Sequence, residues 1–192
     1  NVVTNMNHST SVNGSIFTDA DNGWGDGLNY VENTVTTLPN GQTAAVDAHR
    51  GLQATWDFFK NVYGRNGIDN TGKATFSRMH YSSSYDNAFW QDSCFCMTYG
   101  DGDPAGGGSV GEADLDTAGH EMTHGVCANT ANLTYSGESG GLNESNSDIF
   151  GAMIEFYARG GSGSTIGSTG GNWKIGEQLN ASPLRYMDKP SL

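Results

Sequence analysis

The chain has 192 residues, a length that suits one ordinary domain or two small ones and permits a sizeable core. Its 9 Lys and Arg against 21 Asp and Glu give a formal net charge of −12, which argues against nucleic acid or an anionic membrane as a partner. No apolar run approaches the roughly 20 residues that a membrane-spanning helix needs. The 20 aromatic residues (4 Trp, 8 Tyr, 8 Phe) with only 16% charged residues indicate a folded chain.

The first 45 residues alternate short apolar stretches with Asn, Gly, Thr and Asp, which predicts short strands separated by turns, at residues 2–3, 15–17 and 29–31. Over residues 43–63 apolar side chains recur every three or four positions, which predicts a helix that ends at Gly64. Residues 76–99 are again strand-like, and a glycine-rich loop follows. Two further helices are predicted at residues 116–130 and 141–159.

The three cysteines, Cys94, Cys96 and Cys127, cannot all pair within the chain. The spacing of Cys94 and Cys96 permits either a short disulfide or two free thiols. Both alternatives stay open at the level of sequence.

The first of the two later helices contains His120-Glu121-Met122-Thr123-His124. Histidines four residues apart project from the same helix face, so both imidazoles can reach one metal ion. Glu121 is rotated by about 100° from His120 and can reach a metal-bound water without being a ligand. This pattern indicates a hydrolytic zinc site, in which ligands fix the ion and a carboxylate takes the proton of the water. The alternative is a pair of surface histidines on an ordinary amphipathic helix.

The next helix offers the remaining parts of such a site. A catalytic zinc needs a third protein ligand, which Glu144 can provide. Asp148 lies one turn further on the same face and can accept the second ring N–H of a ligating histidine. A short connection favours antiparallel helices, and in that register His124 faces Glu144 while His120 faces Asp148.

The same register places Asp116 opposite Glu155 at the other end of the helix pair. Two facing carboxylates repel each other unless they are protonated or bridged by a cation. Residues 172–177 can add a carboxylate, an amide and a carbonyl, and oxygen-rich sites of this kind suit calcium. The alternative is that Asp116 is only a helix N-cap and Glu155 a solvated side chain.

Together, the motif at 120–124 and the stretch Asn143-Glu144-Ser145-Asn146-Ser147-Asp148 closely resemble the thermolysin family of neutral metalloendopeptidases, for which a His-His-Glu zinc is already the standard description. The likeness runs from about Val46 onwards. It includes the stretches at residues 46–49, 85–90, 99–103 and 184–187.

The resemblance implies an α+β fold with a β-rich N-terminal lobe, residues 1–134, that includes the active-site helix. Residues 135–192 would begin a helical C-terminal lobe. It also implies a secreted endopeptidase that loses a leader and a pro-segment. Such an enzyme hydrolyses internal bonds of peptide or protein substrates before bulky apolar residues, using a zinc-activated water.

Carried over by position, the resemblance implies roles for individual residues. Glu121 would be the general base, Tyr135 would steady the oxyanion, and Asp148 would partner His120. The implied zinc ligands are His120, His124 and Glu144. The implied substrate contacts are Asn87, Ala88, Leu184 and Arg185. The implied calcium donors are Asp116, Glu155, Asn172, the Lys174 carbonyl and Glu177. A lysine at position 174 opposes a second ion, so we expect one calcium there.

Family members continue into a helical lobe that supplies a histidine for the transition state, whereas His8, His49 and His80 of this chain lie upstream. Loss of an oxyanion donor costs about a hundred- to a thousand-fold in rate. We therefore expect the chain alone to bind zinc but to be a poor peptidase, with that lobe or its own pro-segment as a partner.

Two alternative functions remain open. One is an inactive zinc- and calcium-binding fragment of such a protease. The other is a zinc aminopeptidase, which shares the zinc motif but needs an acidic anchor for the free amine of its substrate. Nothing in the sequence marks such an anchor.

Overall fold

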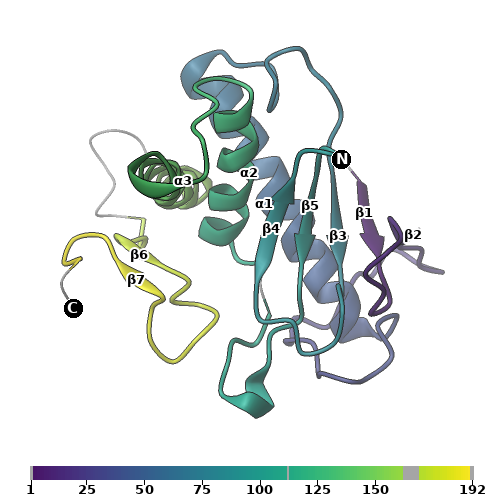
Figure 1. The fold of residues 1–192 in the computed structure, drawn as a ribbon. Coiled ribbons are helices and arrows are strands. Elements are labelled where there is room, and N and C mark those ends of the chain that lie inside the picture. The colour runs from purple at the N-terminus through teal and green to yellow at the C-terminus, as the bar shows by residue number, and fades with distance from the viewer. Residues whose placement is uncertain (1, 112, 162–168, 191–192) are drawn as a thin grey trace.

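A computed structural model describes residues 2–111, 113–161 and 169–190. Its N-terminal part contains a five-stranded sheet in the order β2-β1-β3-β5-β4 (Figure 1). The central strand β3 runs parallel to β1 and β5, whereas the two edge strands run antiparallel to their neighbours. The strands are β1 (Val2–Asn5), β2 (Ser15–Ile16), β3 (Phe76–Met79), β4 (Ala88–Gln91) and β5 (Cys96–Tyr99).

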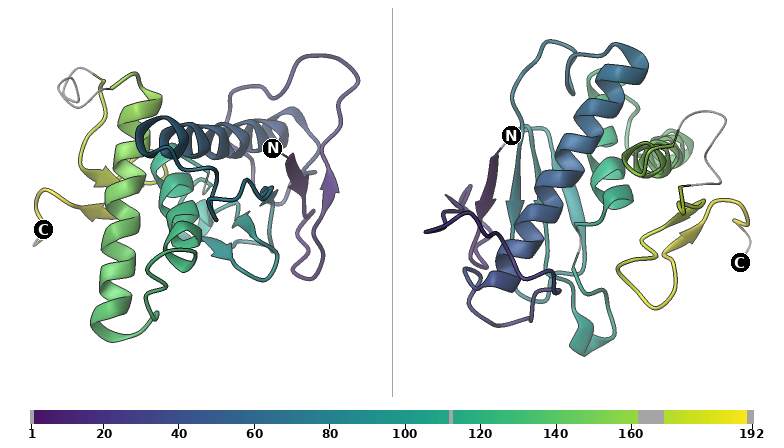
Figure 2. Two further views of the ribbon diagram at one scale, coloured as in Figure 1. Left: turned by 90° about the horizontal axis from the view of Figure 1, so that it is seen from above. Right: turned by 180° about the vertical axis from the view of Figure 1, so that it is seen from behind.

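Three α-helices accompany this sheet in the described residues: α1 (Pro39–Tyr63), α2 (Leu115–Ala128) and α3 (Gly137–Ala158). Helix α1 crosses the back of the sheet, and α2 lies between the sheet and α3 (Figures 1 and 2). A 3₁₀ turn, η1 (Pro104–Gly106), precedes α2. After α3, the strands β6 (Lys174–Ile175) and β7 (Arg185–Tyr186) form a small antiparallel sheet. The fold is thus α+β, as predicted.

Helix α1 begins four residues before the predicted start because Pro39 occupies its first turn, where the fixed backbone angle of proline suits a helix and no N–H is needed. Its predicted end at Gly64 is confirmed. Gly64 has a left-handed φ of 67°, and its N–H donates to the Lys60 carbonyl at 3.0 Å.

The predicted strand at residues 29–31 is wrong, because this segment pairs with no strand in the described chain. Its apolar character comes from Tyr30, which is buried and packs its ring 4.6 Å from that of His80. The segment is therefore held by a side chain and not by backbone pairing. None of the described helices has the length and apolar character needed to cross a bilayer.

One hydrophobic core joins the three helices to the sheet. Leu52 of α1, Met79 and Met97 of the sheet, Met122 of α2 and Ile154 of α3 are each at most 1% exposed. Side chains from every layer thus meet at one place, which fixes the position of α2 between the sheet and α3.

The helices α2 and α3 cross at a pair of glycines. A Cβ atom on Gly119 would lie 3.1 Å from the Cα of Gly151, and one on Gly151 would lie 2.5 Å from the Asp116 carbonyl oxygen. The two backbones therefore touch, and only hydrogen atoms fit at the crossing.

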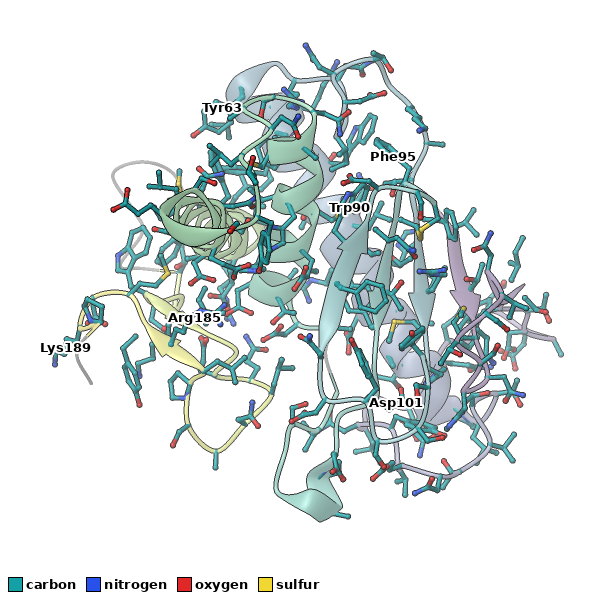
Figure 3. The ribbon with its side chains drawn as sticks, viewed as in Figure 1. Tyr63, Trp90, Phe95, Asp101, Arg185 and Lys189 are labelled. Atoms are coloured by element: carbon teal, nitrogen blue, oxygen red, sulfur yellow. A yellow bond between two sulfur atoms is a disulfide. The ribbon has the colours of Figure 1, made fainter. Side chains whose placement is uncertain are left out.

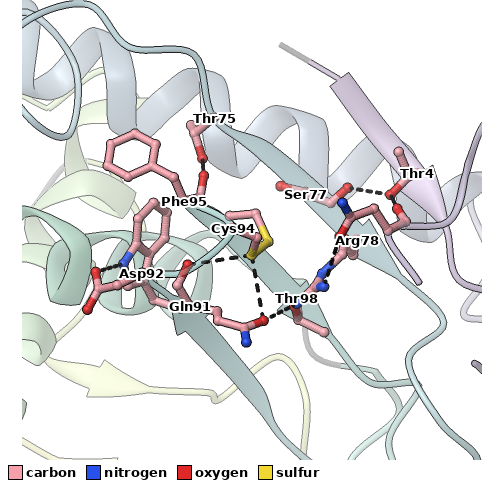
Figure 4. Close-up of a disulfide and its surroundings, with 12 residues drawn as sticks. Thr4, Thr75, Ser77, Arg78, Gln91, Asp92, Cys94, Phe95 and Thr98 are labelled. Atoms are coloured by element: carbon pink, nitrogen blue, oxygen red, sulfur yellow. Dashed lines mark hydrogen bonds between the residues drawn. A yellow bond between two sulfur atoms is a disulfide. The ribbon is translucent and has the colours of Figure 1, made fainter. Parts of the chain in front are cut away.

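Cys94, in the turn between β4 and β5, forms a disulfide with Cys96 at the start of β5 (Figure 4), which decides between the two alternatives left by the sequence. Phe95 between them is buried and carries a positive φ of 56°. Cys127 is a buried free cysteine in α2.

Two substitutions in α3 test the importance of the helix crossing. Gly151→Ala should lower the free energy of unfolding by about 1–3 kcal/mol, because its methyl group overlaps the backbone of α2. Gly141→Ala in the same helix meets nothing within 4 Å and should raise the free energy of unfolding by up to about 1 kcal/mol. Urea denaturation followed by circular dichroism measures both, and equal effects would contradict the tight crossing.

Candidate active site

The two histidines of α2 and a glutamate of α3 converge on one point. The Nε2 atoms of His120 and His124 lie 3.0 Å apart, and each is 3.4 Å from an oxygen of Glu144. The three ligand atoms all lie within 4.8 Å of one another. The structure therefore brings together the three residues that the sequence suggested as zinc ligands.

The opposite ring nitrogens show which atoms are free to bind a cation. His120 Nδ1 lies 2.7 Å from Asp148 Oδ1, and His124 Nδ1 lies 2.7 Å from Asn143 Oδ1. Both oxygens are hydrogen-bond acceptors, so we assign the ring protons to Nδ1 and the lone pairs to Nε2. When both rings are neutral, the two Nε2 lone pairs and the Glu144 carboxylate then face one another. This donor set fits a zinc ion.

The pKa values of two of these groups show how strongly they are coupled before a metal binds. Burial lowers the pKa of His120, but hydrogen bonds to Asp148 and Glu144 outweigh it and raise the pKa to about 9. The hydrogen bond with His120 lowers the pKa of Glu144 to about 2. The surrounding carboxylates thus favour positive charge at this point, and a cation that binds here displaces the proton.

Glu121 lies beside this group without joining it. Its Oε2 accepts a hydrogen bond from the Trp90 backbone N–H at 3.2 Å, and its Oε1 is 4.0 Å from His120 Nε2. Burial raises the pKa of Glu121 to about 7. A carboxyl group with that pKa can both accept and release a proton near neutral pH.

The edge strand β4 is fixed against α2 by Trp90, and Figure 3 shows Trp90 and Arg185 on either side of α2. A Cβ atom on Gly125 would lie 2.6 Å from the Trp90 ring, so the indole rests directly on the helix backbone. The ring of Phe95 packs edge-on against Trp90 at 5.1 Å. This packing keeps the Trp90 N–H within reach of Glu121.

Tyr135 and Arg185 border the same site. The Tyr135 hydroxyl donates to Glu144, a contact that raises the pKa of Tyr135 to about 12 and keeps it a donor. Arg185 donates two hydrogen bonds to Asp148, from Nε to Oδ2 at 2.7 Å and from Nη2 to Oδ1 at 2.6 Å. The sequence suggested Arg185 only as a substrate contact. The structure adds that it orients the carboxylate that holds His120.

A cavity of about 540 Å³ is lined by the three candidate zinc ligands and by Glu121, Trp90, Tyr135 and Arg185. Its lining includes the four residues suggested as substrate contacts, namely Asn87, Ala88, Leu184 and Arg185. Among the lining residues that the sequence did not suggest are Thr117, Asn143 and Ile175. The sequence could have indicated Asn143, because it lies one residue before the predicted ligand Glu144 on the same helix.

A second polar cluster lies at the other end of the helix pair. Asp116 and Glu155 are 2% and 1% exposed, so Glu155 is not solvated. Asp114, and not Asp116, is the N-cap of α2, since its side chain accepts the Thr117 N–H. The alternatives of Asp116 as only a helix N-cap and of Glu155 as a solvated side chain are therefore both wrong.

Further oxygens surround that pair. Asn172 Nδ2 donates to Glu177 Oε1 at 2.8 Å, and the Gly176 N–H, between Lys174 and Glu177, donates to Asp116 Oδ2 at 2.8 Å. Within this cluster, three buried oxygens have no hydrogen-bond partner in the described part of the chain: Glu155 Oε2, Asn172 Oδ1 and Glu177 Oε2. Burial, with the nearby charge of Asp114, raises the pKa of Asp116 to about 9. One positively charged side chain also contacts this cluster: Arg159 Nη2 lies 2.7 Å from Glu155 Oε1.

Comparison with known proteins places these features in a family. The family model described as "Thermolysin metallopeptidase, catalytic domain" matches residues 1–128, and the one described as "Thermolysin metallopeptidase, alpha-helical domain" matches residues 131–192. The transglutaminase-activating metalloprotease of Streptomyces mobaraensis is 50% identical over 191 residues, which are 97% of this chain and 22% of that protein. Thermolysin of Alicyclobacillus acidocaldarius is 39% identical over 178 residues, 88% of this chain and 28% of that protein.

A solved structure, the precursor of protealysin from Serratia proteamaculans, superposes with a TM-score of 0.73 at 29% identity. The match covers 93% of this chain and 48% of that one. The chain therefore spans about half of this solved relative and less than a third of the two curated relatives above.

The amide of Asn143 is expected to matter for metal affinity. Asn143→Leu removes the acceptor that orients His124 and should weaken zinc binding about 10- to 100-fold. Ser145→Ala, on the exposed side of the same helix, should leave the affinity unchanged. Competition with a chromogenic chelator measures both dissociation constants, and equal values would show that the hydrogen bond to Asn143 is dispensable.

Proposed function

The chain belongs to the thermolysin family of metallopeptidases, and from this premise we propose that it carries the catalytic centre of a zinc-dependent endopeptidase. The observation that supports the proposal most is the convergence of His120 Nε2, His124 Nε2 and the Glu144 carboxylate beside the buried Glu121. Ligands and base come from two helices whose crossing is fixed by close packing.

In this proposal His120, His124 and Glu144 hold the zinc ion. When bound, the ion supplies a Lewis acid that polarises a peptide carbonyl and makes a water molecule more acidic. Glu121 accepts a proton from the attacking water and delivers it to the departing amine. Its pKa of about 7 suits both steps, and the Trp90 N–H holds Oε2 while leaving Oε1 for the water. The Tyr135 hydroxyl donates to the oxygen on which negative charge develops.

The substrate lies along β4 as an added strand. Strand β4 is the last strand of the sheet and pairs only with β5 in the described chain, so its other edge is open for a peptide. Asn87 and Ala88 begin this edge and line the cavity. Leu184, with Ile175, borders the space for the residue after the scissile bond, which favours bulky apolar side chains there. Arg185 contacts a substrate carbonyl from its exposed side.

We further propose that the second polar cluster binds one calcium ion. Asp116, Glu155, Asn172, Glu177 and the Lys174 carbonyl are its donors, and the three unpaired buried oxygens support this. A divalent cation would offset the burial and the nearby negative charge that raise the pKa of Asp116. The ion would tie β6 and the following loop to α2 and α3, and so position Ile175 and Leu184.

The proposal extends to the surroundings of the chain. We place the protein outside the cell, where the bridge between Cys94 and Cys96 persists. The division at residue 134 is supported by the two family matches, which meet near residue 130. Leu142 and Ile149 of α3 are 61% and 41% exposed and offer a face for the remaining helical lobe, while a pro-segment would cover the cleft in a precursor.

The assignment of the base is tested by Glu121→Gln. Zinc content should remain at one ion per chain, whereas cleavage of an N-terminally acetylated peptide at an internal bond should slow at least about a hundred-fold. Glu138→Gln on the exposed start of α3 is the control and should change neither. Metal analysis and mass spectrometry of the products are the measurements.

Retained cleavage by Glu121→Gln would refute the role of Glu121. Removal of single N-terminal residues from unblocked peptides only would favour an aminopeptidase.

The calcium proposal is tested by thermal unfolding with and without calcium in zinc-loaded protein. Calcium should raise the Tm, because it binds the folded cluster only. Glu177→Gln should reduce this rise by at least half, since it removes one charged donor. Glu138→Gln again serves as the control with an unchanged rise. An equal rise in both variants would place the ion elsewhere.

A further inference from the structure

One threonine of α2 differs from the other threonines in the described helices. Thr43, Thr55 and Thr123 each donate a hydrogen bond from Oγ1 to the backbone carbonyl four residues earlier, at 3.3, 2.9 and 2.7 Å. Thr117 Oγ1 is buried and has no hydrogen-bond partner in the described part of the chain. The whole residue is only 8% exposed.

The position of Thr117 explains this difference. It lies in the first turn of α2, so the residue four positions earlier precedes the helix and offers no aligned carbonyl. The neighbouring carboxylates do not compensate, because Asp114 Oδ1 and Asp116 Oδ1 accept the Thr117 backbone N–H and not its hydroxyl. A buried hydroxyl without a partner is costly, and such groups call for an explanation.

Thr117 lies one turn before the catalytic group, on the helix face that carries His120 and Glu121, and it lines the same cavity. Ile175 and Leu184, which border the space for the residue after the scissile bond, are close by. The Gly176 N–H, next to Ile175, donates to Asp116 Oδ2 at 2.8 Å, and Leu184 touches Gly176. The cavity lining thus includes these two aliphatic side chains and the threonine. A rotation about χ1 exchanges the threonine methyl and hydroxyl, so either can face the cavity.

We infer that the Thr117 hydroxyl makes this subsite accept a polar side chain as well as an aliphatic one, so that the enzyme also cleaves before asparagine. The inference rests on the proposed endopeptidase function and narrows its substrate class. A hydroxyl both donates and accepts, so it can pair with either end of an asparagine amide. A purely aliphatic wall would leave that amide buried and unpaired.

Leucine and asparagine side chains have nearly the same shape, as do threonine and valine, which permits a sharp test. The zinc-loaded protein is given two N-terminally acetylated peptides that differ only in Leu or Asn after the scissile bond. In Thr117→Val the ratio of kcat/KM for Asn over Leu should fall about ten-fold. In Thr117→Ser, which keeps the hydroxyl, the ratio should stay within about two-fold of the parent value. An unchanged ratio in Thr117→Val would overturn the inference.

A binding measurement separates this inference from the proposed activity. In a Glu121→Gln background, in which cleavage should be at least about a hundred-fold slower, calorimetry gives the Kd of each peptide. Thr117→Val should weaken binding of the Asn peptide about ten-fold and leave that of the Leu peptide unchanged. If no peptide is cleaved by any variant, the proposed activity fails, and this Kd pattern still decides the role of Thr117.

Stability provides the last check. Because the hydroxyl has no partner in the described structure, Thr117→Val should not lower the Tm. A lower Tm would mean that the hydroxyl is already bonded in the free protein, which would overturn the inference.

Discussion

The close crossing of α2 and α3 is the constraint on which the site depends. At Gly119 and Gly151 the two backbones touch, and this sets how far the side chains of one helix reach towards the other. On one side of this crossing, the spacing lets His120 and His124 approach Glu144 at 3.4 Å, while their Nδ1 atoms are bonded to partners on α3. At the opposite end it buries carboxylates of both helices side by side. A wider crossing would separate both groups at once, so metal chemistry and helix packing share one cause.

The sheet contributes the other half of the cleft through a single strand. Strand β4 brings a backbone N–H to Glu121, and it is held there because Trp90 rests on the backbone of α2 at Gly125. The turn behind it is closed by the disulfide and filled by Phe95. In the first turn of α2, two neighbouring side chains face different groups. Asp116 faces the buried carboxylates and accepts the Gly176 N–H, while Thr117 lines the cleft.

The features that the sequence revealed are those with a regular spacing. Helices were found because buried side chains repeat every three or four residues, and the pairing of α2 with α3 followed from two four-residue intervals on facing helices. Features set by contacts between distant segments had no such signal. Tyr30 is a buried residue of a loop because its ring packs on that of His80. Arg185 is hydrogen-bonded to Asp148 because β7 passes beside α3. Thr117 becomes noticeable only when its missing hydrogen bond is seen.

We propose that His120, His124 and Glu144 together hold one zinc ion. A crystal structure of the zinc-loaded protein, with anomalous data collected on both sides of the zinc absorption edge, tests it most directly. We expect one strong peak in contact with both Nε2 atoms and a Glu144 oxygen, with His120 Nδ1 still bonded to Asp148 and His124 Nδ1 to Asn143. A peak elsewhere, or Nε2 atoms that stay 3.0 Å apart with no ion between them, would contradict it.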